Sequence, residues 1–288
     1  MIDYNPKSWF SLIFQFHKSD TFRILFSVMI AISIYTSLLV FVQQKYDVIF
    51  KSTTVVHSLL GFVISLLLVF RTNTAYDRWW EGRRLYGALV NNSRNFSMKL
   101  NAFIPESHKE KKGLFHVLIH NYVFSMKEHL RNGVKMDELI NHPEHDSSQL
   151  TNFKHIPNQI ASSVFKELNF LYTNKIISGN QLIVLNEEAR SFTEIVGACE
   201  RIKSTPIPYS YSLFLKKFMF VYIMTMPFAF IQDFGYWTAL IVVFVFYVLA
   251  SLELLAEEIE DPFGTEPNDL PTDEISLRIK GNLKEIFG

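Results

Sequence analysis

Four long stretches of the chain contain no Lys, Arg, Asp or Glu. The first runs from Ile24 to Gln44 and the second from Ser52 to Phe70. The third and fourth are Phe218 to Gln232 and Phe234 to Leu252. An apolar helix of about 20 residues crosses the roughly 30 Å hydrocarbon layer of a membrane. The pattern therefore predicts four transmembrane helices, with a soluble protein of four buried helices as the alternative.

The third and fourth stretches meet at the segment 233–236, which contains an aspartate and a glycine. So short a connection with turn-forming residues predicts a tight hairpin of two helices. Pro227 lies inside the third stretch, so we expect a kink there or a backbone that faces other protein.

Basic residues are unevenly distributed around these stretches. One set precedes the first and third stretches and follows the second: Lys7, Lys18, Arg23, Arg71, Arg78, Arg83, Arg84, Lys216 and Lys217. Only Lys45 and Lys51 lie in the first connection, and the connection between the third and fourth stretches has none. Because Lys and Arg concentrate on the cytosolic side, both termini and the long middle region are predicted to be cytosolic. The segment 1–7 is not typical of a cleaved signal peptide, so the first helix is expected to be retained.

The region from Arg71 to about Ser212 is amphipathic. Two sets of apolar residues recur three and four positions apart: Phe115, Leu118, Ile119, Tyr122, Met126 and Leu130, and Leu182, Leu185, Ala189, Phe192, Val196 and Cys199. This spacing predicts helices that bury one face in a core. Asn132, Gly133 and the segment 141–157 predict loops between them.

Because strand signals are weak throughout, the predicted fold class is all-α: an integral membrane protein with four transmembrane helices and a helical cytosolic domain. The predicted segments are 1–70, with the first two transmembrane helices, and 71–213, the helical cytosolic region. They are followed by 214–255, with the last two transmembrane helices, and 256–288, a cytosolic tail.

Composition argues against several classes of function. Lys+Arg and Asp+Glu both number 28, so no basic surplus exists to neutralise the phosphates of a nucleic acid. A single cysteine, Cys199, excludes a disulfide framework or an all-cysteine zinc site within one chain. The common nucleophile-elbow, P-loop, zinc-protease and Cys-x-x-Cys motifs do not occur. We therefore predict a protein that is not an enzyme and needs no cofactor.

Seven of the nine histidines lie in the middle region. His116 and His120 stand four residues apart and could share one helical face as a metal-binding pair. No third ligand accompanies them at motif spacing, so no metal site is predicted. The pair leaves open one alternative function, that of a membrane scaffold or enzyme whose cytosolic domain binds a ligand.

Three segments carry a family resemblance. The unit Arg78-Trp79-Trp80-Glu81 follows the second apolar stretch, the segment 199–209 precedes the third, and the segment 259–271 follows the fourth. In composition, order and position these segments resemble the signature regions of the bestrophin family of ion channels, and the chain looks like a bacterial member.

The resemblance implies a homopentamer in the bacterial inner membrane around one central pore that passes small monovalent ions. It implies a hydrophobic neck at Phe62, Leu66 and Phe70, and a cytosolic aperture that falls on Ile177. The preference for anions or cations stays open. One subunit has only four apolar helices, too few to surround an aqueous path, so an oligomer is expected on physical grounds as well.

Neighbouring residues have simpler expected roles. Gly61 allows a close approach to the second helix or breaks it there. Arg78, Trp79 and Trp80 are typical of anchors at a membrane interface. Glu81, like Asp77, can pair with a nearby arginine of its own helix.

The C-terminal segment departs from the animal relatives. Their dense acidic run, which helps to hold calcium, is replaced here by Glu260 and Asp261 followed by Pro262, Phe263 and Gly264. Too few adjacent carboxylates remain for the six or more oxygens that calcium takes. Asp261 and Pro262 are expected to end the fourth helix.

Overall fold

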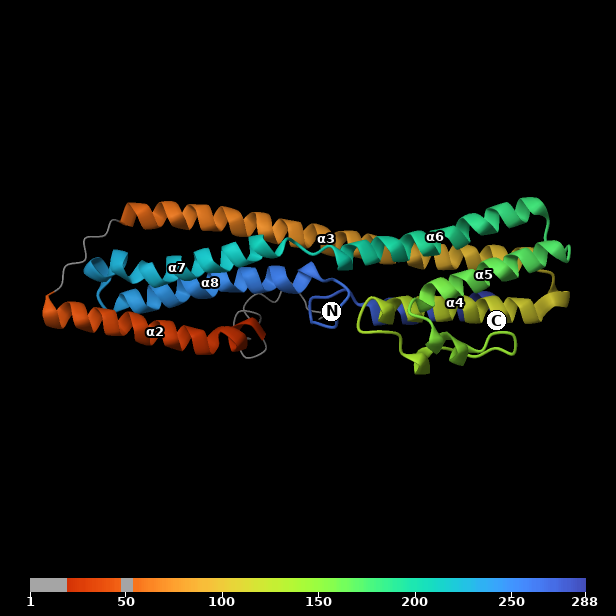
Figure 1. Cartoon of the computed structure of the whole chain (residues 1–288), viewed down its shortest axis with the longest axis horizontal. Helices are drawn as coiled ribbons and strands as arrows, with labels where there is room; N and C mark the ends of the chain where they lie inside the picture. Colours follow the sequence, from red (N-terminus) through yellow and green to blue (C-terminus); the bar gives the residue numbers. More distant parts are fainter. Residues whose placement is uncertain (1–19, 48–53) are drawn as a thin grey trace. The chain divides into compact units, whose positions relative to one another are not determined.

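A computed structural model describes residues 20–47 and 54–288 of the chain. Lys7, Lys18 and Lys51, and with them part of the charge pattern used for orientation, lie outside these residues. The described part is helical and contains no strand, only an isolated β-bridge in the loop before α5. Its α-helices are α2 (Asp20–Tyr46), α3 (Thr54–Phe103), α4 (Lys109–His129), α5 (Ile156–Thr173), α6 (Gly179–Ser204), α7 (Tyr209–Phe234), α8 (Trp237–Glu260) and α9 (Thr272–Phe287) (Figure 1). Short 3-10 helices η2 (Glu106–His108), η3 (Met136–Glu138) and η4 (Ser147–Asn152) lie in the connections.

Four of the described helices are long and apolar enough to cross a membrane, as predicted. They are α2, α3, α7 and α8. The second apolar stretch is only the first part of α3, which continues for 50 residues to Phe103. Residues 70–103 contain no proline, and the helix ends just before Pro105, because proline disfavours the helical conformation in the residue that precedes it.

The chain divides into two compact units. Among the described residues, unit 2 contains 20–47, 54–78 and 206–260, and unit 1 contains 79–205 and 261–288. These divisions follow contacts between residues. The segment boundaries predicted at 70/71, 213/214 and 255/256 concern the membrane border and stay predictions.

Unit 2 consists of α2, the N-terminal part of α3, α7 and α8. Both α2 and α7 pack against α8, and all three run roughly parallel to the N-terminal part of α3 in Figure 1. The predicted hairpin is confirmed, since α7 ends at Phe234 and α8 begins at Trp237. Gly235 between them has φ +55°, a conformation that favours glycine. Pro227 lies inside α7.

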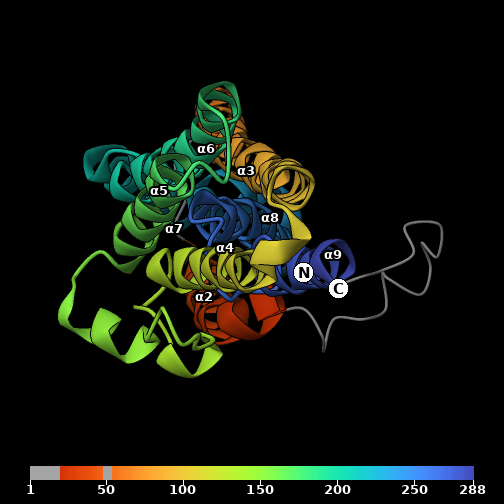
Figure 2. The same cartoon turned by 90° about the vertical axis from the view of Figure 1, so that its right-hand side faces the viewer.

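Unit 1 consists of the C-terminal part of α3 with α4, α5, α6 and α9. Helix α4 lies against α5 and α9, and α5 lies against α6 (Figure 2). Both predicted apolar stripes are confirmed, because every member is buried in the core of unit 1 except Leu182, which is partly buried. Cys199 is fully buried, as expected of a core residue, and burial raises the pKa of its thiol to about 12.

The predicted loops also occur. Gly133 has φ +112° in the turn after α4. The second loop ends slightly earlier than predicted, because Pro157 already lies in the first turn of α5, where its missing N–H costs nothing.

Candidate functional site

The N-terminal part of α3 has one buried face and one exposed apolar face. The buried face carries His57, Ile64, Leu68, Arg71 and Ala75, each at most 8% exposed. The exposed face carries the three predicted neck residues: Phe62 is 66% exposed, Leu66 45% and Phe70 57%. Val55 and Leu59 extend this face toward the start of the helix. We call the set Val55, Leu59, Phe62, Leu66 and Phe70 the apolar α3 face.

Beyond Phe70 polar residues join the exposed surface of α3. Asn73, Thr74 and Asp77 are all exposed. The apolar α3 face is thus followed, within two helical turns, by exposed polar side chains that water can solvate.

Contacts with α7 hold the opposite side of α3. A Cβ atom on Gly61 would lie only 2.7 Å from the hydroxyl oxygen of Tyr222. His57 Nε2 lies 3.2 Å from the hydroxyl oxygen of Thr225, one turn further along α7. The expected close approach at Gly61 is therefore confirmed, and α3 runs through this glycine without a break.

A buried arginine fixes α3 at the end of its apolar part. Arg71 is 1% exposed and its Nη2 donates to Glu260 Oε2 at 2.6 Å, while its Nε lies 3.7 Å from Glu253 Oε2. The other oxygen of Glu260 accepts the backbone N–H of Ile207 at 2.6 Å. A charge in so dry a place is stable only when it is paired and hydrogen-bonded. The sequence pattern indicates only a cytosolic charge at Arg71 and carries no signal for this network.

The signature residues connect segments that are distant in the sequence. Arg78 Nε donates to the carbonyl oxygen of Glu260 at 3.0 Å, and Trp79 Nε1 donates to that of Asn268 at 3.0 Å. Trp80 is 48% exposed.

Glu81 has a different partner from the one expected. Its Oε1 accepts from Arg201 Nη2 of α6 at 2.7 Å, so the prediction of a partner on its own helix is wrong for Glu81. Helix packing brings Arg201 close even though it is far away along the chain. The three segments that carry the resemblance are thus joined by these hydrogen bonds.

Ile177 lies in the core of unit 1. Its side chain is 4% exposed, whereas Ser178, which caps α6, and Asn180 are exposed. An aperture lined by Ile177 stays a prediction, and in one subunit the accessible surface of this turn belongs to its polar neighbours.

His116 and His120 do not face a common ligand. The ring of His120 stacks on Phe124, with centroids 4.2 Å apart, and its Nε2 lies 3.1 Å from the carbonyl oxygen of Glu138. Burial lowers the pKa of His120 to about 4 and also lowers that of His116, which lies beside Phe287. This geometry lends no support to a metal held by the pair.

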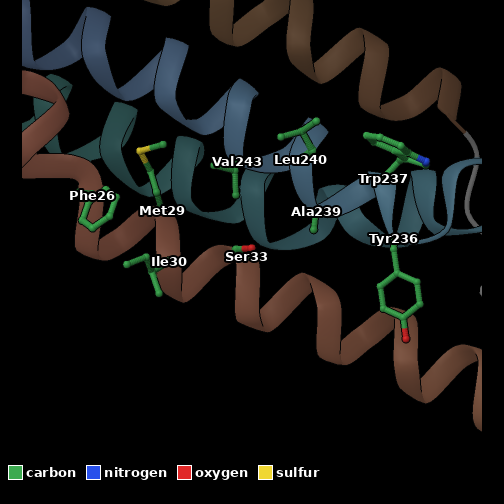
Figure 3. Close-up of a pocket in the computed structure, with 9 residues that line it drawn as sticks. All are labelled: Phe26, Met29, Ile30, Ser33, Tyr236, Trp237, Ala239, Leu240 and Val243. Atoms are coloured by element: carbon green, nitrogen blue, oxygen red, sulfur yellow. The ribbon is translucent and has the colours of Figure 1, made fainter. Parts of the chain in front are cut away.

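Unit 2 also has an apolar groove between α2 and α8 (Figure 3). It is lined by Phe26, Met29, Ile30, Ser33, Tyr236, Trp237, Ala239, Leu240 and Val243. No charged side chain lies in it, so its surface suits contact with hydrocarbon rather than with a polar substrate.

Comparison with known proteins agrees with these features. The family described as Bacterial/Fungal Bestrophin protein matches residues 1–285. A voltage-dependent anion channel-forming protein of Nostoc is 33% identical to this chain, over 97% of this chain and 92% of its own length. The protein YneE of Escherichia coli K12, which carries the same description, is 30% identical over 99% of this chain and 94% of its own. The solved structure of a bacterial bestrophin homologue from Klebsiella pneumoniae covers 92% of this chain and 98% of its own, with TM-score 0.83 and 27% identity.

Proposed function

Because the chain belongs to the bacterial and fungal bestrophin family, we propose that it forms a membrane channel through which small monovalent ions move passively. Its four long apolar helices and its family make it a membrane protein. The fold and the family favour a channel over an enzyme or scaffold.

The observation that carries the proposal is the apolar α3 face. Its large side chains are left uncovered by their own subunit, although the opposite face of the same helix is buried. Several copies of α3 that face one another would form rings of Phe62, Leu66 and Phe70. A narrow apolar ring excludes water and so blocks ions until it widens, which is a known way of gating a channel.

The assembly that we propose is a homopentamer, on the strength of the family resemblance. It would lie in the bacterial inner membrane with both termini in the cytosol, since basic residues cluster on that side of the helices. Arg78, Trp79 and Trp80 would lie where α3 leaves the membrane. The cytosolic aperture would lie at the turn between α5 and α6, which Ile177 anchors in the core of unit 1.

Anions are the proposed cargo, because the two relatives described above are named as anion channel-forming proteins. An aromatic ring presents a positive edge or a negative face, so Phe62 and Phe70 can favour either charge, depending on their orientation. The sign of the permeant ion is therefore the part of the proposal that the measurement must decide.

The experiment is ion flux into proteoliposomes. Purified wild-type protein should conduct, and the triple substitution Phe62→Ala, Leu66→Ala and Phe70→Ala should increase the leak by widening the rings. Reversal potentials in asymmetric salt give the sign of the permeant ion. A pentamer should be found by measuring the mass of the detergent complex.

A matched control is available on α2. Ile34, Leu38 and Phe41 are also exposed apolar residues, at 64%, 58% and 49%, but they lie outside the proposed neck. Alanine at all three should leave flux unchanged. The pore assignment fails if the wild type and the α3 triple variant are equally silent, or if the α2 variant leaks as much as the α3 variant.

A further inference from the structure

One group of side chains in unit 1 has the composition of a metal site. His129, His155 and Glu200 each offer a ligand atom, and these atoms all lie within 4.8 Å of one another. Of the residues that the structure describes, no other group of three or more His, Cys, Asp or Glu meets this condition. The proposed pore uses none of the three residues.

Three separate helices bring this group together. His129 is the last residue of α4, His155 is the N-cap of α5, and Glu200 lies in the last turns of α6. The Nε2 atoms of both histidines lie 2.7 Å from the same oxygen, Glu200 Oε1. The two rings are tilted against each other with centroids 4.4 Å apart. Both imidazoles therefore converge on one carboxylate oxygen from neighbouring helices.

The site is accessible to an ion. The side chains are 22%, 31% and 36% exposed for His129, His155 and Glu200. This is enough for a hydrated cation to enter, while the helix backbones that carry the ligands are held by the core of unit 1. Cys199, next in sequence to Glu200, does not join the site, because it is fully buried in that core.

The donor set suits a first-row transition metal. Two imidazole nitrogens and one carboxylate are a common ligand set for zinc, which binds them at about 2.0–2.2 Å and leaves a fourth position for water. Imidazole disfavours calcium and magnesium, which prefer sites made entirely of oxygen. We propose that this cluster binds one zinc-like divalent ion per subunit and thereby ties together the ends of α4, α5 and α6.

Binding requires a rearrangement of one proton. His155 Nδ1 accepts the backbone N–H of Asn158 at 3.2 Å, so its neutral ring carries the proton on Nε2 and donates it to Glu200. A metal takes the Nε2 lone pair, which moves the ring proton to Nδ1 and breaks this capping hydrogen bond. The loss of this hydrogen bond, which caps α5, opposes metal binding. A variant whose α5 is capped without the His155 ring should therefore bind the metal more tightly.

The consequence for the protein is local stiffening. Glu200 is followed by Arg201, which binds Glu81 of α3, and Lys203 Nζ donates to the carbonyl oxygen of Arg131 just after α4 at 2.6 Å. A bound ion would add a third link between α6 and its neighbours in unit 1. Metal occupancy should thus raise the temperature at which unit 1 unfolds, whether or not the protein conducts ions.

The test is titration of the metal-free, full-length protein in detergent with zinc chloride, followed by calorimetry. We expect one zinc per subunit and a higher unfolding midpoint. His129→Gln and Glu200→Gln should each weaken binding by more than about tenfold. His108→Gln is the control, because His108 is an exposed histidine of the same unit that lies outside the cluster.

Cobalt provides an optical readout that is independent of the calorimetry. Wild-type protein loaded with Co²⁺ should show visible ligand-field absorption, and the double variant H129Q/E200Q should lose it. Size-exclusion profiles identify any variant that has lost its fold. The proposal is overturned if the wild type binds less than one zinc per subunit at saturation, if it shows no cobalt band, or if a folded H129Q/E200Q binds zinc as tightly as the wild type.

Discussion

The contact between Gly61 and Tyr222 predicts that the smallest possible change on α3 destabilises the protein. In Gly61→Ala, the new methyl carbon would lie 2.7 Å from the hydroxyl oxygen of Tyr222 and 3.4 Å from its Cζ. Tyr222 is 8% exposed and its ring lies beside that of His57, with centroids 5.8 Å apart, so it has little room to move.

Two effects of opposite sign decide the magnitude. Forcing an extra methyl group into a packed site costs about 1–3 kcal/mol. Alanine in place of glycine inside a helix gains about 1 kcal/mol. The overlap wins, so we expect a net loss of up to about 2 kcal/mol. For a chain of this size that corresponds to a fall of a few degrees in the unfolding midpoint, at about 2–4 °C per kcal/mol.

A second substitution should reverse this loss. Tyr222→Phe removes the hydroxyl and leaves Cζ at 3.4 Å from the new methyl carbon, which is ordinary van der Waals contact. The double variant Gly61→Ala/Tyr222→Phe should therefore unfold at or above the temperature of Tyr222→Phe alone. Thermal unfolding of the detergent-solubilised protein, followed by tryptophan fluorescence, measures all four members of the cycle.

Gly197 provides the control. It lies in helix α6 and a Cβ there would meet nothing within 4 Å, so Gly197→Ala should keep the full helix gain and raise the midpoint. The reasoning is refuted if Gly61→Ala raises the midpoint as much as Gly197→Ala does while Tyr222 is intact.

Three further predictions concern buried side chains. Ile177→Ala should destabilise the protein by about 2–5 kcal/mol, because it leaves a cavity at a core position. Phe62→Ala should leave the unfolding midpoint in detergent nearly unchanged. Equal effects of the two substitutions would contradict the burial seen for Ile177. Arg71→Met should cost about 3–5 kcal/mol by leaving Glu260 without its partner, and adding Glu260→Gln should recover part of this loss; additive losses in the same thermal assay would argue against the pair. Burial lowers the pKa of His120 from 6.5 to about 4, so protonation of this ring favours the unfolded chain. The neutral ring therefore contributes about 3 kcal/mol of stability above pH 6.5, and this contribution should be lost as the pH falls to about 4. In His120→Gln this part of the pH dependence should vanish, and an unchanged pH profile would show that another group causes it.

Local pattern was sufficient to predict the four apolar helices and the amphipathic helices α4 and α6, whereas α5 and α9 were not singled out. A membrane helix needs a long apolar run, and a core helix needs apolar residues three and four positions apart. Both patterns can be recognised from residues that are close together in the sequence. This is why the four apolar helices, the hairpin at Gly235 and the buried stripes of α4 and α6 agree with the structure. The family motif at Arg78 likewise needed only a short segment to be recognised.

The face that α3 exposes could not be predicted from its pattern. Between Val55 and Phe70 the helix has no charged residue and carries apolar side chains on every side, so periodicity does not distinguish an outer face from an inner one. Only the packing within unit 2 shows that Ile64 and Leu68 are buried while Phe62 and Leu66 are uncovered. The family resemblance supplied the neck residues, and a measurement of flux must test them.

Charged and polar partners were decided by tertiary structure alone. Arg71 looked like a membrane-border charge, yet it is buried against Glu260, and Glu81 binds Arg201 on another helix. The cluster that Glu200 forms with two histidines joins three helices and has no motif spacing. Helix propensity and hydropathy act over a few residues along the chain. An ion pair or a ligand set depends instead on the packing of the core, because this packing decides which residues of different helices come within hydrogen-bond distance.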